Sequence, residues 1–447
     1  MAGEAFEHGW SLMKARYEKG RAHSPEAWDR ANARDIMGAF NHHYGQDQIP
    51  LRDDIVAAVE YAGIGGTEEG FRRANVDTAI SVDNWKEVLM ANAAHNKDSE
   101  AEHAVIDLND GGEGAPKARA KRYADLADGR QLHYHASPFC TELSGARGSK
   151  KKSHTLSWQH MNGIEDTWRE LQRLLGKDKV SFSTEQTPNF KNPFLKPTGE
   201  NLKSLKRGEW RMPSEEFASL IGMPNVSAAQ HGGIQTRNRA FFGDGWETPT
   251  PKFNRKNQRT IDSVMPWLKD DWADAADSRT ERLARLVSEG RLGSEGLEYL
   301  STIPSLTDSG TWRPGNRDAV WPEGLGHKKN TWPNKIMIGG KKAYPEGGSI
   351  SRSLHHLKPL NETGWSQTHH PIGVTDTRFL TNPERLLYNG MDPSRDLSML
   401  GDINNPNDKN IGQALGNVVS PLAGEAVMNQ VTRRLDNKNK WSNYQNR

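Results

Sequence analysis

The chain has 447 residues, and its 59 lysines and arginines nearly balance its 57 acidic residues, which leaves a formal net charge of +2. This balance excludes a globally polybasic protein, so any contact with nucleic acid has to come from local basic patches. A single cysteine, Cys140, excludes an internal disulfide and a zinc site built from cysteines alone, and we expect no metal site. Because no apolar run could span a membrane and the first residues lack a secretory signal, we expect an intracellular, cytoplasmic protein without membrane contact.

The first part of the chain predicts a helical extension followed by an alternating pattern. Residues 1–48 are interpreted as the helical extension, which ends near Tyr44-Gly45. Beyond it, apolar runs predict strands at 55–59, 78–82 and 104–106, and helices are expected between them at 68–73 and 85–95. Strands that alternate with helices predict an α/β fold with a mostly parallel, doubly wound sheet.

The remaining chain is interpreted as a continuation of this sheet, interrupted by a separate domain. A strand at 131–135, a helix at 164–175 and a strand at 180–183 extend the pattern, and a last helix is expected at 421–435. Many tryptophans, glycines and prolines indicate an irregular domain in between. The predicted organisation is an extension (1–48), the first part of the α/β domain (49–245), the irregular domain (246–372) and the returning segment (373–447).

A glycine-rich turn marks a candidate ligand loop. Gly63-x-Gly65-Gly66 follows the first strand and opens a helix, where backbone N–H groups and the helix N-terminus favour an anionic or polar ligand. Asp83 ends the second strand about 20 residues later, the usual place of a ribose partner, and Asp107 at the third strand could accept from an adenine amino group. The alternative is an ordinary tight turn with two helix-capping aspartates.

Two further residues are candidates for covalent and acid–base chemistry. Cys140 follows a predicted strand and precedes a basic, glycine-containing loop at 145–152, a setting that activates a thiolate as a nucleophile. Glu185 ends the following strand, where a carboxyl group can act as a general acid. The alternatives are a small buried cysteine and a solvated loop glutamate.

The segment Gln235-x-Arg237-x-Arg239 places one amide and two guanidinium groups on one face of a predicted strand, because alternate residues share a face. Such a row can bind a phosphate or orient a carboxylate. The alternative is a solvated edge strand.

Taken together and in order, these segments resemble the DNA (cytosine-5)-methyltransferase family over roughly residues 55–245 and 373–430. The matching segments are Tyr61-Ala62-Gly63-Ile64-Gly65-Gly66 for the cofactor loop, Ser137-Pro138-Phe139-Cys140 for the nucleophile, Thr184-Glu185-Gln186 for the catalytic glutamate, Gln235-Thr236-Arg237-Asn238-Arg239 for the glutamine-arginine-arginine motif, and Gly416-Asn417-Val418 for the final motif.

The resemblance implies a Rossmann-like class I methyltransferase domain in which residues 246–372 form an inserted target-recognition domain. It also implies transfer of a methyl group from S-adenosylmethionine to C5 of a cytosine that is flipped out of double-stranded DNA. Cys140 would form a covalent adduct with C6, Glu185 would hold or protonate N3, and Gln235, Arg237 and Arg239 would position the nucleotide and the glutamate. We expect a monomer of prokaryotic or phage origin.

The remaining site residues that the resemblance and the charge pattern imply form two sets. The expected cofactor-binding residues are Tyr61, Ala62, Gly63, Ile64, Gly65, Gly66, Asp83, Asn84, Trp85, Asp107, Leu108, Pro138, Asn417 and Val418. The expected DNA-binding residues are Ser144, Arg147, Lys150, Lys151, Lys152, Arg255, Lys256 and Arg259.

Three other functions stay open at this point. Because Thr141 directly follows Cys140, a tRNA cytosine-5 methyltransferase is an alternative function, although the large recognition domain favours DNA as the substrate. The family pattern is not met at Val59, Glu60 and Phe139, so a modified sulfonium cofactor is an alternative. Asn417 favours S-adenosylmethionine itself. A DNA-binding protein with a decayed site is the non-enzymatic alternative. The sequence leaves open the target DNA sequence, the role of residues 1–48, and service in restriction-modification, phage genome modification or regulation.

Overall fold

The structure is a computed structural model, and it falls into two compact units that we describe separately. The sheet unit comprises Gln46–His231, Arg237–Lys252 and Asn417–Arg447, and the second unit comprises Met1–Gly45, Gly232–Thr236 and Phe253–Gly416. The residues that the structure describes are 33–45, 50–96, 99–138, 154–222, 225–234, 238–253, 259, 264–265, 336–338, 341–343, 382–401 and 409–445.

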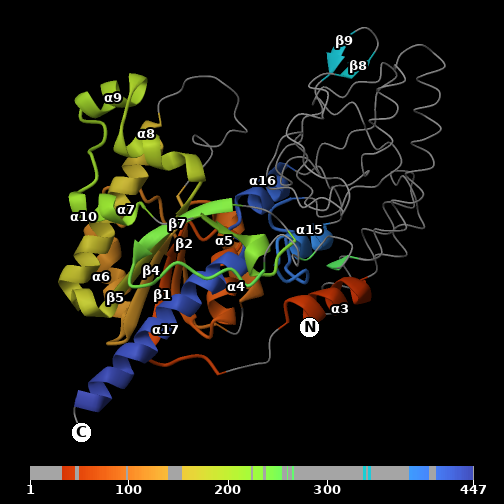
Figure 1. Ribbon diagram of the computed structural model, residues 1–447, viewed down its shortest axis with the longest axis horizontal. Helices are drawn as coiled ribbons and strands as arrows, with labels where there is room; N and C mark the ends of the chain where they lie inside the picture. Colours follow the sequence, from red (N-terminus) through yellow and green to blue (C-terminus); the bar gives the residue numbers. More distant parts are fainter. Residues whose placement is uncertain are drawn as a thin grey trace, which may run out of the picture. The chain divides into compact units, whose positions relative to one another are not determined.

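A seven-stranded sheet forms the centre of the sheet unit, in the order β3-β2-β1-β4-β5-β7-β6 (Figure 1). β1 pairs in parallel with both β2 and β4, so the strand order reverses at β1, as in doubly wound folds. β7 is antiparallel to β5 and β6. The strands are β1 (Ile55–Glu60), β2 (Asp77–Asp83), β3 (Glu102–Val105), β4 (Gln131–Ala136), β5 (Val180–Gln186), β6 (Asn225–Ser227) and β7 (Asn238–Asp244).

Helices cover both faces of the sheet. On one face, α4 (Gly66–Arg73) lies against α17 (Pro421–Gln445), and α5 (Lys86–His95) contacts β2 and β3 (Figure 1). On the other face, α6 (Pro116–Ala127) and α7 (Thr155–Leu175) pack together over β1, β4 and β5. This order and layering confirm the predicted Rossmann-like, doubly wound α/β fold.

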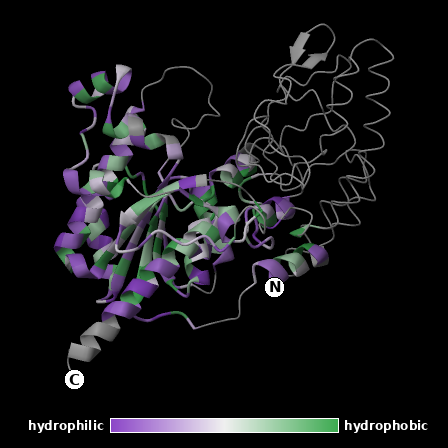
Figure 2. Cartoon of the chain, in the orientation of Figure 1, coloured by the Kyte–Doolittle hydropathy of each residue, from purple (hydrophilic) through white to green (hydrophobic). Residues whose placement is uncertain are grey.

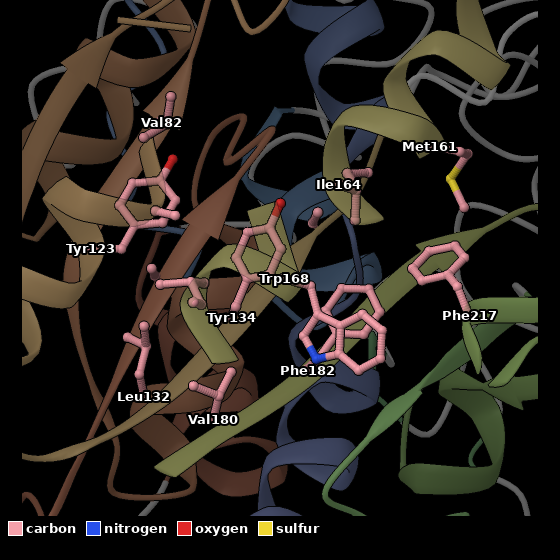
Figure 3. Packing of buried hydrophobic residues seen from close by; sticks show 14 of the residues in the cluster. Val82, Tyr123, Leu132, Tyr134, Met161, Ile164, Trp168, Val180, Phe182 and Phe217 are labelled. Atoms are coloured by element: carbon pink, nitrogen blue, oxygen red, sulfur yellow. The ribbon is translucent and has the colours of Figure 1, made fainter. Parts of the chain in front are cut away.

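Each face of the sheet has its own apolar core. The α6–α7 side buries Tyr134, Trp168 and Phe182, with the Trp168 and Phe182 rings stacked at 5.5 Å (Figure 3). The α4–α17 side buries Phe71 and Val427 among others. Hydrophobic residues are frequent in the strands, and hydrophilic residues are frequent in the helices that cover them (Figure 2). Burial of both faces explains the continuous apolar runs of the parallel strands.

An aromatic helical segment follows β5 and was not predicted from the sequence. It contains η3 (Pro188–Phe190), α8 (Lys191–Leu195), α9 (Gly199–Lys206) and α10 (Glu215–Leu220). Phe194 stacks on Trp158 of α7 at 4.9 Å between ring centroids, and Phe190 stacks on Phe242 of β7 at 5.1 Å. These aromatic contacts fix the segment against the end of the sheet that carries Glu185.

The second unit is described only in part. Its elements are α3 (Ala33–His43), β8 (Ile336–Ile338), β9 (Lys341–Ala343), α15 (Asn382–Tyr388) and α16 (Lys409–Asn417), whose last residue belongs to the sheet unit. β8 and β9 form an antiparallel pair, and α3 contacts α15.

The sequence predicted β1, β2, β4 and β5 within a few residues, whereas other elements differ. β3 begins and ends earlier than the expected 104–106, α7 begins well before residue 164, and α17 runs ten residues beyond Leu435 to Gln445. Two smaller elements of the sheet unit were missed, η2 (Lys177–Lys179) and η4 (Ala228–His231), as was α6. Within the described ranges, no helix combines the length and the apolar character needed to cross a lipid bilayer.

Candidate active site

The candidate ligand loop joins the carboxyl end of β1 to α4. Gly63 and Gly65 adopt positive φ angles of 56° and 88°, which glycine reaches at no steric cost. The N–H of Ala62 donates to Val82 O at 3.1 Å, so the loop is fixed to the end of β2. A Cβ added at Gly63 would meet no heavy atom within 4 Å, so this face of the loop is open to a ligand.

Asp83 at the end of β2 is bonded directly to this loop. Its Oδ2 accepts from the N–H of Gly63 at 2.9 Å, and its Oδ1 accepts from the N–H of Trp85 at 2.8 Å. Burial raises the pKa of Asp83, and the N–H groups of Trp85, Gly63 and Asn84 oppose that shift. The carboxylate therefore holds the loop and the start of α5 in place.

Asp107 lies at the next position along the same sheet edge. The N–H of Ile106 donates to Asp83 O at 3.1 Å, which carries the chain from β3 past the end of β2. The Asp107 side chain is exposed and accepts from the N–H of Asn109 at 3.0 Å. Asn84 is exposed, and Trp85 and Leu108 are half-buried on the same edge. An open glycine loop with a carboxylate at the end of the neighbouring strand is the arrangement that nucleotide-binding sheets present to a ribose.

The final motif of the chain closes against the same loop. A Cβ on Gly66 would lie 2.2 Å from Val419 O and 2.5 Å from a Val418 methyl carbon, so only glycine permits this approach. Val418 is buried, whereas Asn417 is exposed. Two segments more than 300 residues apart in the sequence therefore meet at the start of α4.

Glu185 and Arg239 form an ion pair at the carboxyl end of β5. The Nε of Arg239 lies 2.5 Å from Oε1 of Glu185, and the two side chains are 19% and 6% exposed. Glu185 pairs with Phe241 across the antiparallel strands, and Arg239 is two residues from Phe241 on the same face. The guanidinium thus fixes the position of the Glu185 side chain at this edge.

The segment Ser137-Pro138, which precedes the predicted nucleophile Cys140, is fixed near this pair. Gln186 is fully buried, and its Nε2 donates to Pro138 O at 3.2 Å. Its Oε1 accepts from the N–H of Thr187 at 2.8 Å. Ser137, at the start of that segment, donates its backbone N–H to Glu60 O at 3.3 Å, so it also joins the end of β1.

Part of the predicted site lies outside the described residues. Cys140, Gln235 and Arg237 lie outside the described residues. So do the expected DNA-binding residues Ser144, Arg147, Lys150, Lys151, Lys152, Arg255 and Lys256. The structure brings together Gly63, Asp83 and Val418 near the ligand loop and, separately, Glu185, Arg239 and Pro138.

Arg259 of the second unit is held by its own surroundings. Its Nη1 donates to His43 O at 2.7 Å and to Gly232 O at 3.2 Å. The guanidinium carbon lies 5.7 Å from the Tyr44 ring centroid and 5.5 Å from that of Phe253. These contacts give the guanidinium a packing role in this unit.

Tyr61 takes an unusual backbone conformation directly before the glycines. Its φ angle is 57°, in the left-handed region that bulky residues rarely adopt. Its hydroxyl lies 2.6 Å from Nδ1 of His160, and the two rings meet edge to face at 5.4 Å. This contact connects the ligand loop with α7.

Sequence reasoning missed a buried polar cluster on the α6–α7 side. Glu60 accepts from the hydroxyls of Tyr123 at 2.9 Å and Tyr134 at 2.7 Å, and it is ion-paired with Arg119. Glu60 and Arg119 are 0% and 2% exposed. The signal was a charged residue in an otherwise apolar strand, and the cluster ties α6 to the two central strands.

A second buried polar group on the opposite face was also missed. His133 and His135 of β4 lie hydrogen-bonded between serines of the same strand region and of β5. Burial lowers the pKa of His135 to about 3 and that of His133 well below its ordinary value, so both imidazoles are neutral. The alternation of polar residues at 133, 135 and 137 was the available signal.

The strand order is that of a Rossmann-like, doubly wound sheet with an antiparallel β7 between β5 and β6. No protein-family model and no curated protein matches the sequence. Among solved structures, the chain is similar to a prophage-encoded E. coli protein described as a DNA modification methyltransferase (14% identity, 86% of this chain and 99% of that chain, TM-score 0.43). It is also similar to S. pombe Dnmt2 methyltransferase (13%, 86% and 99%, TM-score 0.40) and to Entamoeba histolytica methyltransferase EhMeth (13%, 86% and 99%, TM-score 0.43). The fold assignment rests on the strand order, and the resemblance to cytosine-5 methyltransferases rests on the motifs.

Proposed function

We propose that this chain is a DNA cytosine C5 methyltransferase that uses S-adenosylmethionine and forms a covalent intermediate through Cys140. The observation that carries the proposal is the Glu185–Arg239 ion pair beside the segment Ser137-Pro138, which leads directly to Cys140. An acid–base carboxylate next to a nucleophile is the combination that activation of a cytosine ring needs.

The ligand loop supports the choice of cofactor. We assign the open face at Gly63 and the carboxylates of Asp83 and Asp107 to the adenosine part, and the segment Asn417-Val418 to closure of the pocket. The other expected cofactor residues, Tyr61, Ala62, Ile64, Gly65, Gly66, Asn84, Trp85, Leu108 and Pro138, belong to these segments or adjoin them. When bound, S-adenosylmethionine supplies a methyl group that carries its own leaving group.

The residues of this chain would activate the cytosine as follows. The thiolate of Cys140 forms a bond to C6, and the electron pair of the C5–C6 double bond shifts through the ring toward N3. Glu185 receives and releases the proton that N3 takes up, while Arg239 holds the carboxylate in position. C5 of the adduct takes up the methyl group. Loss of the C5 proton then restores the C5–C6 double bond and breaks the bond between C6 and sulfur, which frees the Cys140 thiolate. A stacked base cannot reach this edge, so the cytosine has to be flipped out.

DNA contacts are proposed for two regions. The basic loop with Arg147 and Lys150–Lys152 would contact phosphates after the DNA has bound. Residues 246–372 are proposed as the target-recognition domain, in which Arg255 and Lys256 would contact the duplex. A DNA contact by Arg259 would require its bonds to His43 O and Gly232 O to be given up.

Covalent trapping tests this function. Duplex DNA containing 5-fluorocytosine retains the adduct, because fluorine cannot leave C5 as a proton does. We expect purified protein with S-adenosylmethionine to form a denaturation-resistant complex with this DNA, and Cys140→Ala to form none. A complex with tRNA but not with DNA would contradict the proposed substrate, and no complex with either would contradict the mechanism.

A further inference from the structure

Five buried or partly buried side chains form one continuous row of hydrogen bonds, which we call the histidine–serine chain. Its order is Ser181, His133, Ser183, His135 and Ser137. The Oγ-to-nitrogen distances along this order are 2.9, 2.8, 2.7 and 2.8 Å. All four lie within the range of a good hydrogen bond.

The chain follows from strand register. His133 pairs with Ser181 and His135 pairs with Ser183 across the parallel strands β4 and β5, so all four side chains share one face. The Phe71 ring of α4 meets both imidazoles edge to face, at 5.3 Å from His133 and 5.6 Å from His135. The rings are therefore fixed in a tightly packed layer, where they cannot turn over readily.

Every donor and acceptor of the histidine–serine chain is paired only if all of its hydrogen bonds point in the same direction. A neutral imidazole donates once and accepts once, and a serine hydroxyl has one proton to donate. If Ser183 accepted from both imidazoles, its own proton would have no acceptor among the residues that the structure describes. Since an unmade buried hydrogen bond is costly, Ser183 should accept from one imidazole and donate to the other. Both histidines then carry their proton on the corresponding nitrogen.

The two ends of the chain lie at different places. Ser181 and Ser137 are partly exposed, whereas His133, Ser183 and His135 are 0% exposed. Ala136 pairs with Thr184 at the end of β4, and Ser137 and Glu185 are the next residues of the two segments. The histidine–serine chain thus extends from the partly exposed Ser181, near the start of β5, to Ser137 at the strand ends that carry the candidate active site.

We propose that the histidine–serine chain is a proton relay that lends a proton to the Glu185 end of the site and later takes it back. The inference rests on the proposed function, in which N3 of cytosine gains a proton during thiolate addition and loses it on elimination. Arg239 holds Glu185 in an ion pair, and the proton that Glu185 hands to N3 has to be replaced from another group. A relay through the protein can deliver this proton when bound DNA excludes water from the site.

Every proton in the relay is accounted for. Ser137 passes its proton toward Glu185 and takes one from Nε2 of His135, whose Nδ1 takes the proton of Ser183. Ser183 takes one from Nε2 of His133, whose Nδ1 takes the proton of Ser181, and Ser181 is reprotonated by water. Elimination reverses each transfer. A shuttle of this kind returns both imidazoles to their first tautomer in every turnover, so the packed rings never have to flip.

The direction of the chain can be measured without any activity. Nitrogen NMR of the full-length protein with isotope-labelled histidine reports which ring nitrogen of each histidine carries the proton. We expect both His133 and His135 to carry the proton on Nε2 at neutral pH, because only then can His135 replace the proton that Ser137 passes on. Two histidines protonated on Nδ1 would overturn the proposed direction of the relay. Opposite tautomers would overturn the relay, because Ser183 would then accept from both rings and could pass nothing on.

Kinetics of adduct formation test the role. Ser183→Ala removes the central link, and we expect it to slow trapping on 5-fluorocytosine DNA about 10²-fold and to reduce the solvent deuterium isotope effect on that step. Affinity for S-adenosylhomocysteine should be unchanged. At the partly exposed end, Ser137→Thr should restore the rate that Ser137→Ala loses, because it restores the hydroxyl.

A matched control separates a relay from a purely structural role. Ser204→Ala removes another fully buried hydroxyl, which donates to Asn201 O at 3.0 Å and accepts from Trp210 Nε1 at 2.9 Å on the helical segment. It should lower stability as Ser183→Ala does, yet leave the trapping rate and its isotope effect unchanged. An active wild type with a Ser183→Ala rate within about twofold would overturn the relay alone. An inactive wild type would overturn the proposed function and the relay with it.

Discussion

Arg239 Nε and Glu185 Oε1 lie 2.5 Å apart on neighbouring antiparallel strands, and both side chains are largely buried. The pair sits where β5 ends, next to the backbone that leads to Cys140. Because a buried carboxyl group depends strongly on its partner, Arg239 fixes the position of Glu185. The proposed chemistry therefore depends on a residue that does not itself exchange protons.

Replacement of Arg239 should affect stability and catalysis together. Arg239→Ala leaves Glu185 buried without its charge partner, and we expect a loss of about 3 kcal/mol in the free energy of unfolding. Denaturant unfolding measures this loss, and trapping on 5-fluorocytosine DNA measures the rate, which we expect to fall about 10²-fold. The control is Arg173→Ala, whose ion pair with Glu170 is exposed on α7. Equal effects of the two substitutions would contradict the assignment.

Gly66 should tolerate no side chain. In Gly66→Ala the new Cβ would meet Val419 O at 2.2 Å, so the final motif would have to move away from α4. We expect a loss of about 1–3 kcal/mol in stability and a weaker affinity for S-adenosylhomocysteine in calorimetry. Gly111→Ala is the control, because nothing lies within 4 Å of its Cβ. An unchanged affinity in Gly66→Ala would show that this closure does not form the cofactor pocket.

Asp83 should be needed as a carboxylate. Both of its oxygens accept from backbone N–H groups, those of Gly63 and Trp85, so in Asp83→Asn the amide NH₂ must face one of these donors. The unpaired donor costs about 1–3 kcal/mol, and we expect at least a tenfold weaker affinity for S-adenosylhomocysteine, since 1.4 kcal/mol corresponds to tenfold. Asp125→Asn, an exposed aspartate on α6, should bind as the wild type does. Full affinity in Asp83→Asn would remove Asp83 from the cofactor site.

The sequence was sufficient for the parts of the fold that depend on periodicity. Apolar runs such as Ile55–Val59 and glycines at a strand-to-helix turn predicted the strands and the ligand loop, because sheet alternation and turn geometry are local properties. The approach of Gly66 to Val419 depends on tertiary packing, and only the motif resemblance suggested it. α6 was missed because its apolar face is narrow: Tyr123 is buried, but Lys121 and Arg122 dominate the sequence around it.

The candidate site was likewise predicted only in part from the sequence. The strand pattern predicted Glu185 at a strand end and Arg239 on one face of another strand, and the family resemblance implied that Arg239 positions the glutamate. The antiparallel insertion of β7 beside β5, which brings the two side chains together, is not visible in the sequence. The histidine–serine chain was missed because polar residues in a predicted central strand were treated as ordinary strand residues. Their pairing with Ser181 and Ser183 required the register between β4 and β5.

Acid should destabilise the protein partly through His135. Its pKa is about 3 in the folded protein, below the ordinary value of 6.5, so only the unfolded chain takes up a proton between these values. Stability is therefore full above pH 6.5 and is lost as the pH falls toward 3, by about 1.4 kcal/mol per pH unit. We expect the wild-type Tm to fall more steeply between neutral pH and pH 5 than that of His135→Gln. Parallel Tm curves would contradict a buried neutral His135.

Nucleoside mass spectrometry of unmodified duplex DNA, after incubation with the protein and S-adenosylmethionine, tests cytosine C5 methylation directly. We expect 5-methylcytosine in the wild-type reaction and none with Cys140→Ala. DNA without modified cytosine, from a wild-type protein that binds S-adenosylhomocysteine, would contradict the assignment as a DNA cytosine C5 methyltransferase.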